Sequence, residues 1–198
     1  MKTFFLEIKT SLLLTLVFAV LLCGAYPLAV WAGAQLFFPA KANGSLVTEA
    51  DGTVRGSALL AQSFTTDKYF QPRPSAAGTG YDATSSGGTN LGPTSQKLND
   101  SIKAAVAAYR TSNGLAADAP VPADAVTSSG SGLDPHISVS NAHLQAARVA
   151  KARSLPVDKV QELIAAHTNG PDLGIFGEAG VNVLLLNVAL DQLTAAKK

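Results

Sequence analysis

Cysteine is nearly absent from this chain of 198 residues, because Cys23 is the only one. A single cysteine cannot form a disulfide within the chain, and it cannot make a cysteine-based metal site. Cys23 falls near the start, so residues 39–198 contain no thiol. That part of the chain is therefore compatible with either a reducing or an oxidising compartment.

Charged residues are also scarce, at 15% of the chain, whereas soluble domains contain about 25%. Lys2, Lys9 and Glu7 account for two of the 15 basic and one of the 14 acidic residues, so 13 of each sign remain beyond them. A domain without net charge has no general attraction for nucleic acid, which argues against a nucleic-acid-binding function. We expect the basic series from Arg148 to Arg153 to form a solvated helix face.

Charge is missing altogether from Ser11–Phe38, and this stretch is strongly apolar. Leu, Val or Phe fills 11 positions of Leu12–Val30, which together favour membrane insertion by about 3–6 kcal/mol. The length matches the roughly 20 residues that a membrane-spanning helix needs. Tyr26 and Trp31 suit the interfacial end, and Pro27 removes one helical hydrogen bond and predicts a kink there.

Three other interpretations of the N-terminus remain open. A cleaved signal peptide is disfavoured because the apolar run is long and no small-x-small pair directly follows its Leu-rich part. A lipoprotein signal is suggested by Cys23, but Leu22 stands where a small residue is required. A pilin-like start is suggested by Phe4, Phe5 and Glu7, but the processing glycine is missing.

Small residues recur every fourth position late in the apolar run, at Ala25, Ala29 and Gly33. This spacing puts them on one helix face, where a partner helix could approach closely. Lys2 and Lys9 precede the run and predict a cytoplasmic N-terminus, with the folded domain outside the cell membrane. The expected organisation is a short cytoplasmic segment over 1–10, a transmembrane helix over 11–34, and an extracytoplasmic domain over 35–198.

The periodicity of the remaining chain predicts an α+β or small α/β domain. Leu98, Ile102 and Tyr109 share one face of the clearest helix, which Asn113-Gly114 should end. The expected elements are strands at Ser45–Val47 and Ala58–Phe64, an ordered loop over 72–93, helices over Thr94–Ser112, Ser140–Arg153 and Pro156–His167, and a buried strand turning into a short helix over Val181–Leu190.

Two motifs invite a catalytic or ligand-binding interpretation. The glycine-rich Gly87–Pro93 lacks the Gly-Lys-Ser/Thr ending of a phosphate loop, so turn geometry and close backbone packing explain it better. Ser131, Asp134 and His136 contain the residue types of a hydrolase, and a membrane-anchored hydrolase is the alternative function. No Gly-x-Ser-x-Gly elbow accompanies them, and two potential ligands do not make a metal site. His167 is expected to cap the end of its helix.

The order of several motifs resembles the KdpC family, the accessory subunit of the Kdp potassium-transporting P-type ATPase. The resemblance covers nearly the whole chain. The motifs that carry it are Tyr26-Pro27, Ala42-Asn43-Gly44-Ser45, Tyr69-Phe70, Arg73-Pro74-Ser75-Ala76, Ser86–Pro93, Ser129–Ser138, Arg148-Val149-Ala150, Val181-Asn182-Val183, Leu186-Asn187 and Leu190-Asp191. Leu185 departs from the pattern, since an acidic residue is common there.

The resemblance implies a non-catalytic subunit that assembles with a KdpA-like potassium-binding subunit, a KdpB-like ATPase subunit and a KdpF-like small subunit in the bacterial inner (plasma) membrane. It implies a catalytic chaperone that raises the ATP affinity of the pump, with no cofactor of its own and ATP only through the complex. No catalytic or metal-ligating residue is expected. The candidates for contact with partner or nucleotide are Gly87, Gly88, Asn90, Ser129, Asp134, His136, Gln145, Arg148, Asn182 and Asn187.

Overall fold

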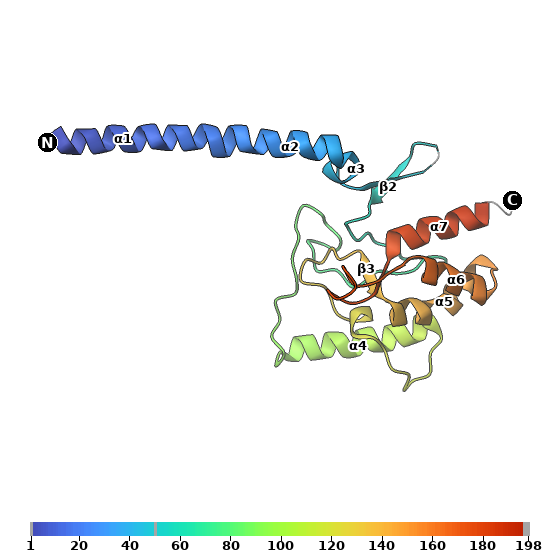
Figure 1. The fold of residues 1–198 in the computed structure, drawn as a ribbon. Helices are drawn as coiled ribbons and strands as arrows, with labels where there is room; N and C mark the ends of the chain where they lie inside the picture. The colour runs from blue at the N-terminus through green and yellow to red at the C-terminus, as the bar shows by residue number, and fades with distance from the viewer. Residues whose placement is uncertain (1, 50, 196–198) are drawn as a thin grey trace. The chain divides into compact units, whose positions relative to one another are not determined.

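The computed structural model describes residues 2–49 and 51–195, which divide into two compact units, residues 1–46 and 47–198 (Figure 1). The first is a helical segment, and the second holds all the strands except the first residue of β1. Helices combined with small sheets confirm the expected α+β class.

The first unit is built on one continuous helix over Lys2–Phe37, made of α1 (Lys2–Phe18), the π-helical η1 (Ala19–Ala25) and α2 (Tyr26–Phe37). It is long and apolar enough to cross a membrane, and none of its most apolar stretch of 18 residues is buried. The short α3 (Pro39–Ala42) follows.

The expected kink at Pro27 is replaced by this π-helical segment. The Tyr26 N–H donates to the carbonyl of Leu21, five residues back, just before the proline that has no donor. A widened turn of this kind accommodates the missing donor locally, and the helix continues without a sharp bend (Figure 1).

The strand β1 (Leu46–Thr48), whose last two residues open the second unit, pairs with β2 (Val54–Ser57). A long irregular segment leads to α4 (Gln96–Asn113), whose N-cap Ser95 accepts from the Leu98 N–H and whose C-cap is left-handed Gly114. The remaining elements are η2 (Ala123–Ala125), β3 (His136–Ser138), α5 (Val139–Arg153), α6 (Val157–Ala166), β4 (Thr168–Asn169), β5 (Gly180–Asn182) and α7 (Val183–Ala195).

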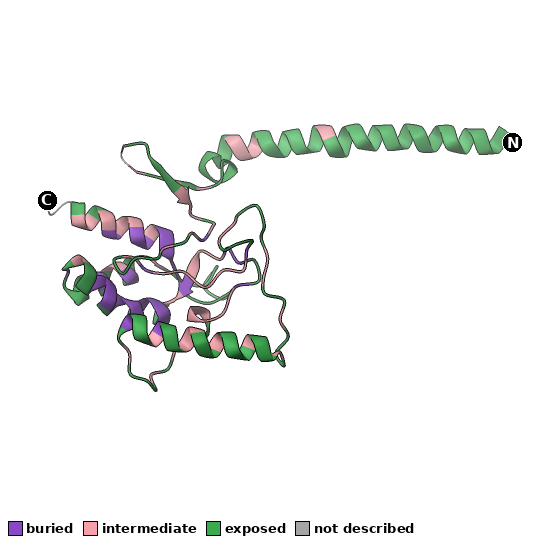
Figure 2. Cartoon of the chain, turned by 180° about the vertical axis from the view of Figure 1, so that it is seen from behind, coloured by how far each residue is buried: buried purple, intermediate pink, exposed green. Residues whose placement is uncertain are grey.

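The central sheet has the order β3–β5–β4, and both pairings are antiparallel. Ile137 and Thr168 both lie opposite Val181, so the middle strand places its one apolar side chain at the centre of the sheet. Buried residues gather on this strand, on α5 and at the start of α7 (Figure 2). The core consists of Phe70, Ile137, Ala142, Ala146, Val149, Ala150, Leu155, Val160, Ile164, Val181, Val183, Leu186 and Leu190.

The helices confirm the periodicity-based expectations to within a few residues, and the strand expected at Ala58–Phe64 is wrong. The Leu60 N–H closes a turn onto Ser57, and the Ala61 N–H bonds the carbonyl of Leu133 in another loop. The segment therefore forms isolated hydrogen bonds to loop residues and does not pair with a neighbouring strand. Pro156 is the N-cap of α6 and not its first helical residue.

Candidate functional site

Two side-chain amides hold the backbone of the segment over 67–71. The Asn187 amide accepts from the Phe70 N–H at 2.8 Å and donates to the Phe70 carbonyl at 2.9 Å. The Gln145 amide does the same for Gln71, at 2.7 and 3.1 Å. Both amides belong to helices, α7 and α5, and are 1% exposed. They replace the neighbouring strand that would otherwise satisfy this buried backbone.

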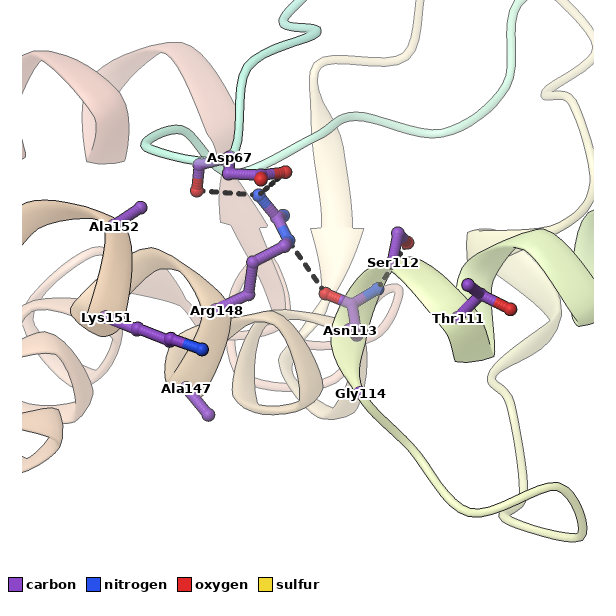
Figure 3. Close-up of a pocket in the computed structure, with 9 residues that line it drawn as sticks. All are labelled: Asp67, Thr111, Ser112, Asn113, Gly114, Ala147, Arg148, Lys151 and Ala152. Carbon is purple, nitrogen blue, oxygen red and sulfur yellow. Dashed lines mark hydrogen bonds and ion pairs between the residues drawn. The ribbon is translucent and has the colours of Figure 1, made fainter.

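Arg148 fixes the other side of the same segment. Its Nη1 donates to the Asp67 carbonyl at 2.8 Å, and its Nε donates to Asn113 Oδ1 at 3.0 Å (Figure 3). Nη1 also donates to the Tyr69 carbonyl at 3.1 Å. Its Nη2 donates to Gln145 Oε1 at 2.8 Å. The rigid guanidinium fork thus joins α4, α5 and the 67–71 segment.

The expectation of a solvated basic face over 148–153 is wrong for two of its three cations. Arg148 is 8% exposed, and this burial lowers the pKa of its guanidinium. The Arg153 side chain is 5% exposed, pairs with Asp191 at 2.8 Å, and stacks 4.9 Å from the Tyr69 ring centre. Lys151 alone is exposed. The spacing of basic residues along a helix cannot distinguish a cation that is exposed to solvent from a cation that anchors a loop.

A groove of about 550 Å³ opens beside Arg148, between the end of α4 and the C-terminal half of α5 (Figure 3). Its cations are Arg148 and the exposed Lys151. The Arg148 fork bonds to Asp67 and Asn113, which also line the groove, so protein acceptors use most of its donors. Asp67 is the only carboxylate among the described residues that line the groove. Its two hydroxyls, on Thr111 and Ser112, donate to backbone carbonyls of α4, so the described residues of the lining contain no nucleophile–base pair.

The glycine-rich segment Gly87–Pro93 and the segment Ser129–Ser138 pack against each other through their backbones. The Gly87 N–H donates to the Ser131 carbonyl at 2.9 Å. Gly132 has φ +68°, and a Cβ there would lie 2.6 Å from the Gly87 carbonyl and 2.7 Å from the Ala77 nitrogen. A Cβ on Gly88 would lie 3.1 Å from the Gly130 carbonyl. Close backbone packing therefore explains these glycines, as expected from the sequence in preference to a phosphate loop.

The structure does not assemble Ser131, Asp134 and His136 into a catalytic triad. Ser131 Oγ lies 3.4 Å from Ser129 Oγ and accepts from the Leu133 N–H at 3.1 Å. Among the described residues, no hydrogen bond joins it to His136. Without a base on the hydroxyl the nucleophile is not activated, so the geometry gives the hydrolase alternative no support.

Asp134 instead ties two loops together. It accepts from Arg73 Nη1 at 2.9 Å and from the His136 N–H at 3.0 Å. The His136 ring, with Nδ1 at 3.8 Å from the carboxylate, acts with these two donors to lower the pKa of Asp134 to about 2. An ionised, paired carboxylate is a structural anchor and not a general acid at neutral pH.

The ten contact candidates separate into buried and accessible residues. Ser129, Gln145, Arg148, Asn182 and Asn187 are buried and bonded within the domain, and Asn182 Nδ2 donates to the Ala58 carbonyl. The accessible or partly accessible candidates are Gly87, Gly88, Asn90, Asp134 and His136. Contact of any of them with a partner or nucleotide stays a prediction, as does the helix-packing role of Ala25, Ala29 and Gly33.

The sequence reasoning missed a second polar cluster at the start of α5. Asp124 accepts from the Ser138 hydroxyl at 2.8 Å and from Asn141 Nδ2 at 2.9 Å, and the Tyr109 hydroxyl donates to Asn141 Oδ1 at 2.7 Å. Burial is the main cause that raises the pKa of Tyr109. The hydroxyl residue that caps the start of α5 was the one feature of the sequence that could have indicated this cluster. His167 Nδ1 lies 2.9 Å from the Leu163 carbonyl, which confirms the expected capping.

These observations define a class: a small α+β domain behind one membrane-compatible helix, with structural polar clusters and, among the described residues, no group of three metal ligands. The family model described as "K+-transporting ATPase, c chain" matches residues 8–192. The chain therefore belongs to the KdpC family. Family membership confirms an accessory subunit of the potassium-transporting ATPase and not its catalytic subunit.

Relatives from several bacteria cover nearly the same length. A potassium-transporting ATPase KdpC subunit of Mycobacterium bovis is 55% identical over 187 residues, 94% of this chain and 98% of the relative. The same subunit of Nitratidesulfovibrio vulgaris is 53% identical over 191 residues, 96% of both chains. That of Rhodospirillum rubrum is 56% identical over 168 residues, 85% of this chain and 86% of the relative.

Proposed function

We propose that this chain stabilises an ATP-driven potassium import complex by anchoring a rigid domain against its KdpA-like, KdpB-like and KdpF-like subunits. The observation that carries the proposal is the helix over Lys2–Phe37, which is apolar and unburied in the chain by itself. Such a helix needs lipid or neighbouring helices around it. Family membership supports a pump as the source of those neighbours.

The orientation belongs to the same proposal. Lys2 and Lys9 lie at the N-terminal end of the helix, which favours a cytoplasmic N-terminus and a domain outside the bacterial inner membrane. A domain on that side could cover the ion entrance of the channel-like subunit. Protease added to right-side-out vesicles should then digest the domain, whereas digestion only after the vesicles are opened would reverse the orientation.

The finer role as a catalytic chaperone rests on the family resemblance alone. ATP is cytoplasmic, so an external domain would raise the ATP affinity of the pump through the membrane helix and not by touching nucleotide. In that case the KM for ATP of the purified pump should increase when this subunit is omitted, with a smaller change in kcat. An unchanged KM would remove the chaperone role and leave the assembly role standing.

Purification in mild detergent tests the assembly itself. The tagged chain, co-expressed with the other pump subunits, should recover them in a fixed ratio. A matched variant in which Ala25, Ala29 and Gly33 are all changed to Leu keeps the helix apolar but fills its small-residue face. Reduced recovery with this variant would assign the face to a partner helix, and recovery of the wild-type chain alone would contradict the proposal.

A further inference from the structure

An ordered hairpin between β4 and β5 presents three large apolar side chains to solvent. Leu173, Ile175 and Phe176 are 89%, 77% and 61% exposed. Single exposed apolar residues are ordinary, but three within four residues form a patch that a folded domain does not leave uncovered without reason. This loop did not figure among the sequence-based site candidates.

Backbone hydrogen bonds hold this hairpin in one conformation. Asp172 and Phe176 form an antiparallel bridge, with N–H to carbonyl distances of 2.8 and 2.9 Å in the two directions. The Ile175 N–H closes the turn onto the Asp172 carbonyl at 3.2 Å. Leu173 and Gly174 both have positive φ, at +53° and +79°, as in tight hairpin turns. The apolar tip is therefore preorganised, which lowers the entropic cost of docking.

The two charged residues that flank the tip in the sequence are both acidic. Asp172 and Glu178 flank it, are exposed, and form no ion pair among the described residues. Both line a groove of about 680 Å³ beside the loop, together with His136. The sequence contains no Lys or Arg from residue 160 to residue 196. A matching surface would therefore offer an apolar pocket with basic residues at its rim.

We propose that the Leu173–Phe176 hairpin tip inserts into an apolar, basic-rimmed pocket on another subunit of the potassium pump. The inference rests on the proposed function, because it takes its partner from the complex. A lipid surface fits less well, since bilayer-binding segments carry Lys or Arg next to their apolar residues, and this one carries carboxylates. A two-fold contact with a second copy would bring the carboxylates of both loops together.

The first test places a photo-crosslinking benzoylphenylalanine at position 175 of the full chain, co-expressed with the pump subunits. The matched control places it at position 59, because Leu59 is also exposed, at 61%, and lies outside the loop. We expect a covalent product with a pump subunit from position 175 and none from position 59. Adducts of position 175 only with lipid, or only with a second copy, would overturn the inference.

The second test compares the L173N/I175N variant with L59N. Leu173 has a positive φ, which Asn tolerates better than Leu does, and the Ile175 side chain is exposed. The double variant should therefore fold, with a melting temperature no lower than that of the wild-type chain. We expect L173N/I175N to weaken recovery of the pump subunits by about tenfold or more, as loss of an interface anchor does, and L59N to leave it unchanged.

The outcomes separate the loop from the proposed function. Equal recovery of pump subunits by the wild-type chain and L173N/I175N would overturn the docking of the loop and leave the accessory role intact. A wild-type chain that recovers no pump subunit at all would contradict the proposed function itself.

Discussion

At the scale of single residues, Asn187 shows how the domain uses side-chain amides as structural substitutes for backbone. It satisfies both polar backbone groups of Phe70, a residue with 0% exposure. We expect Asn187→Ala to leave both groups buried without partners and to lower the free energy of unfolding by about 2–4 kcal/mol. Urea titration of the full chain in detergent measures this.

Asn99→Ala is the control for this prediction, because Asn99 is exposed on α4. Its effect should stay within about 0.5 kcal/mol. A variant at position 187 as stable as the control would show that the Phe70 backbone finds other partners and would remove the bridging role of the amide.

Asp134 gives the domain a pH dependence of known sign. Its pKa in the folded chain is about 2, below the ordinary 3.8, so its stabilisation is complete above pH 4 and is lost as the pH falls through 2. The shift corresponds to about 2 kcal/mol, reduced to about 1–2 because the side chain is 32% exposed. Urea midpoints of the wild-type chain and of Asp134→Asn should converge between pH 5 and pH 2.

The exposed Asp118, for which no bond is found among the described residues, provides the comparison. Asp118→Asn should keep the pH dependence of the wild-type chain. A difference between Asp134→Asn and the wild-type chain that persists at pH 2 would mean that packing of the Asn, and not loss of the charge, causes the destabilisation.

At the scale of elements, the domain depends on two loops whose glycines allow their backbones to touch. Gly132→Ala would place a Cβ within 2.7 Å of backbone atoms at a positive φ, and we expect it to cost about 2–3 kcal/mol or more. Gly130→Ala, two residues earlier, meets nothing within 4 Å and should cost far less. Thermal unfolding compares the stability of the two variants, and equal melting temperatures would contradict the close-packing explanation.

The helices could be predicted from the sequence, whereas the loops could not. Period and capping residues identified α4, α5 and α6, since these signals are local. The run over 58–64 looked like a strand because its composition is apolar, but its hydrogen-bond partner is a loop. A partner far along the chain leaves no trace in local periodicity.

The candidate site was predictable in membership but not in role. Gln145, Arg148 and Asn187 were identified by the family motifs, yet their main partners are backbone groups of 67–71, between 74 and 117 residues away. A polar side chain that serves a distant backbone looks like a ligand-binding residue in the sequence. Burial distinguishes a side chain that satisfies backbone groups from one that binds a ligand, and only the folded structure shows which side chains are buried.

At the scale of the whole molecule, the chain combines an unburied apolar helix with a domain whose polar clusters satisfy one another. The first feature calls for neighbours around the helix, and the second gives the polar clusters a structural role. Both features agree with membership of the KdpC family and with an accessory role in the pump.

Growth at limiting potassium tests this role most directly, in cells whose own copy of this subunit has been deleted. We predict that the full chain restores growth, and that residues 47–198 exported without the helix do not. Failure of the full chain to restore growth, although it is present in the membrane at its normal level, would contradict the account.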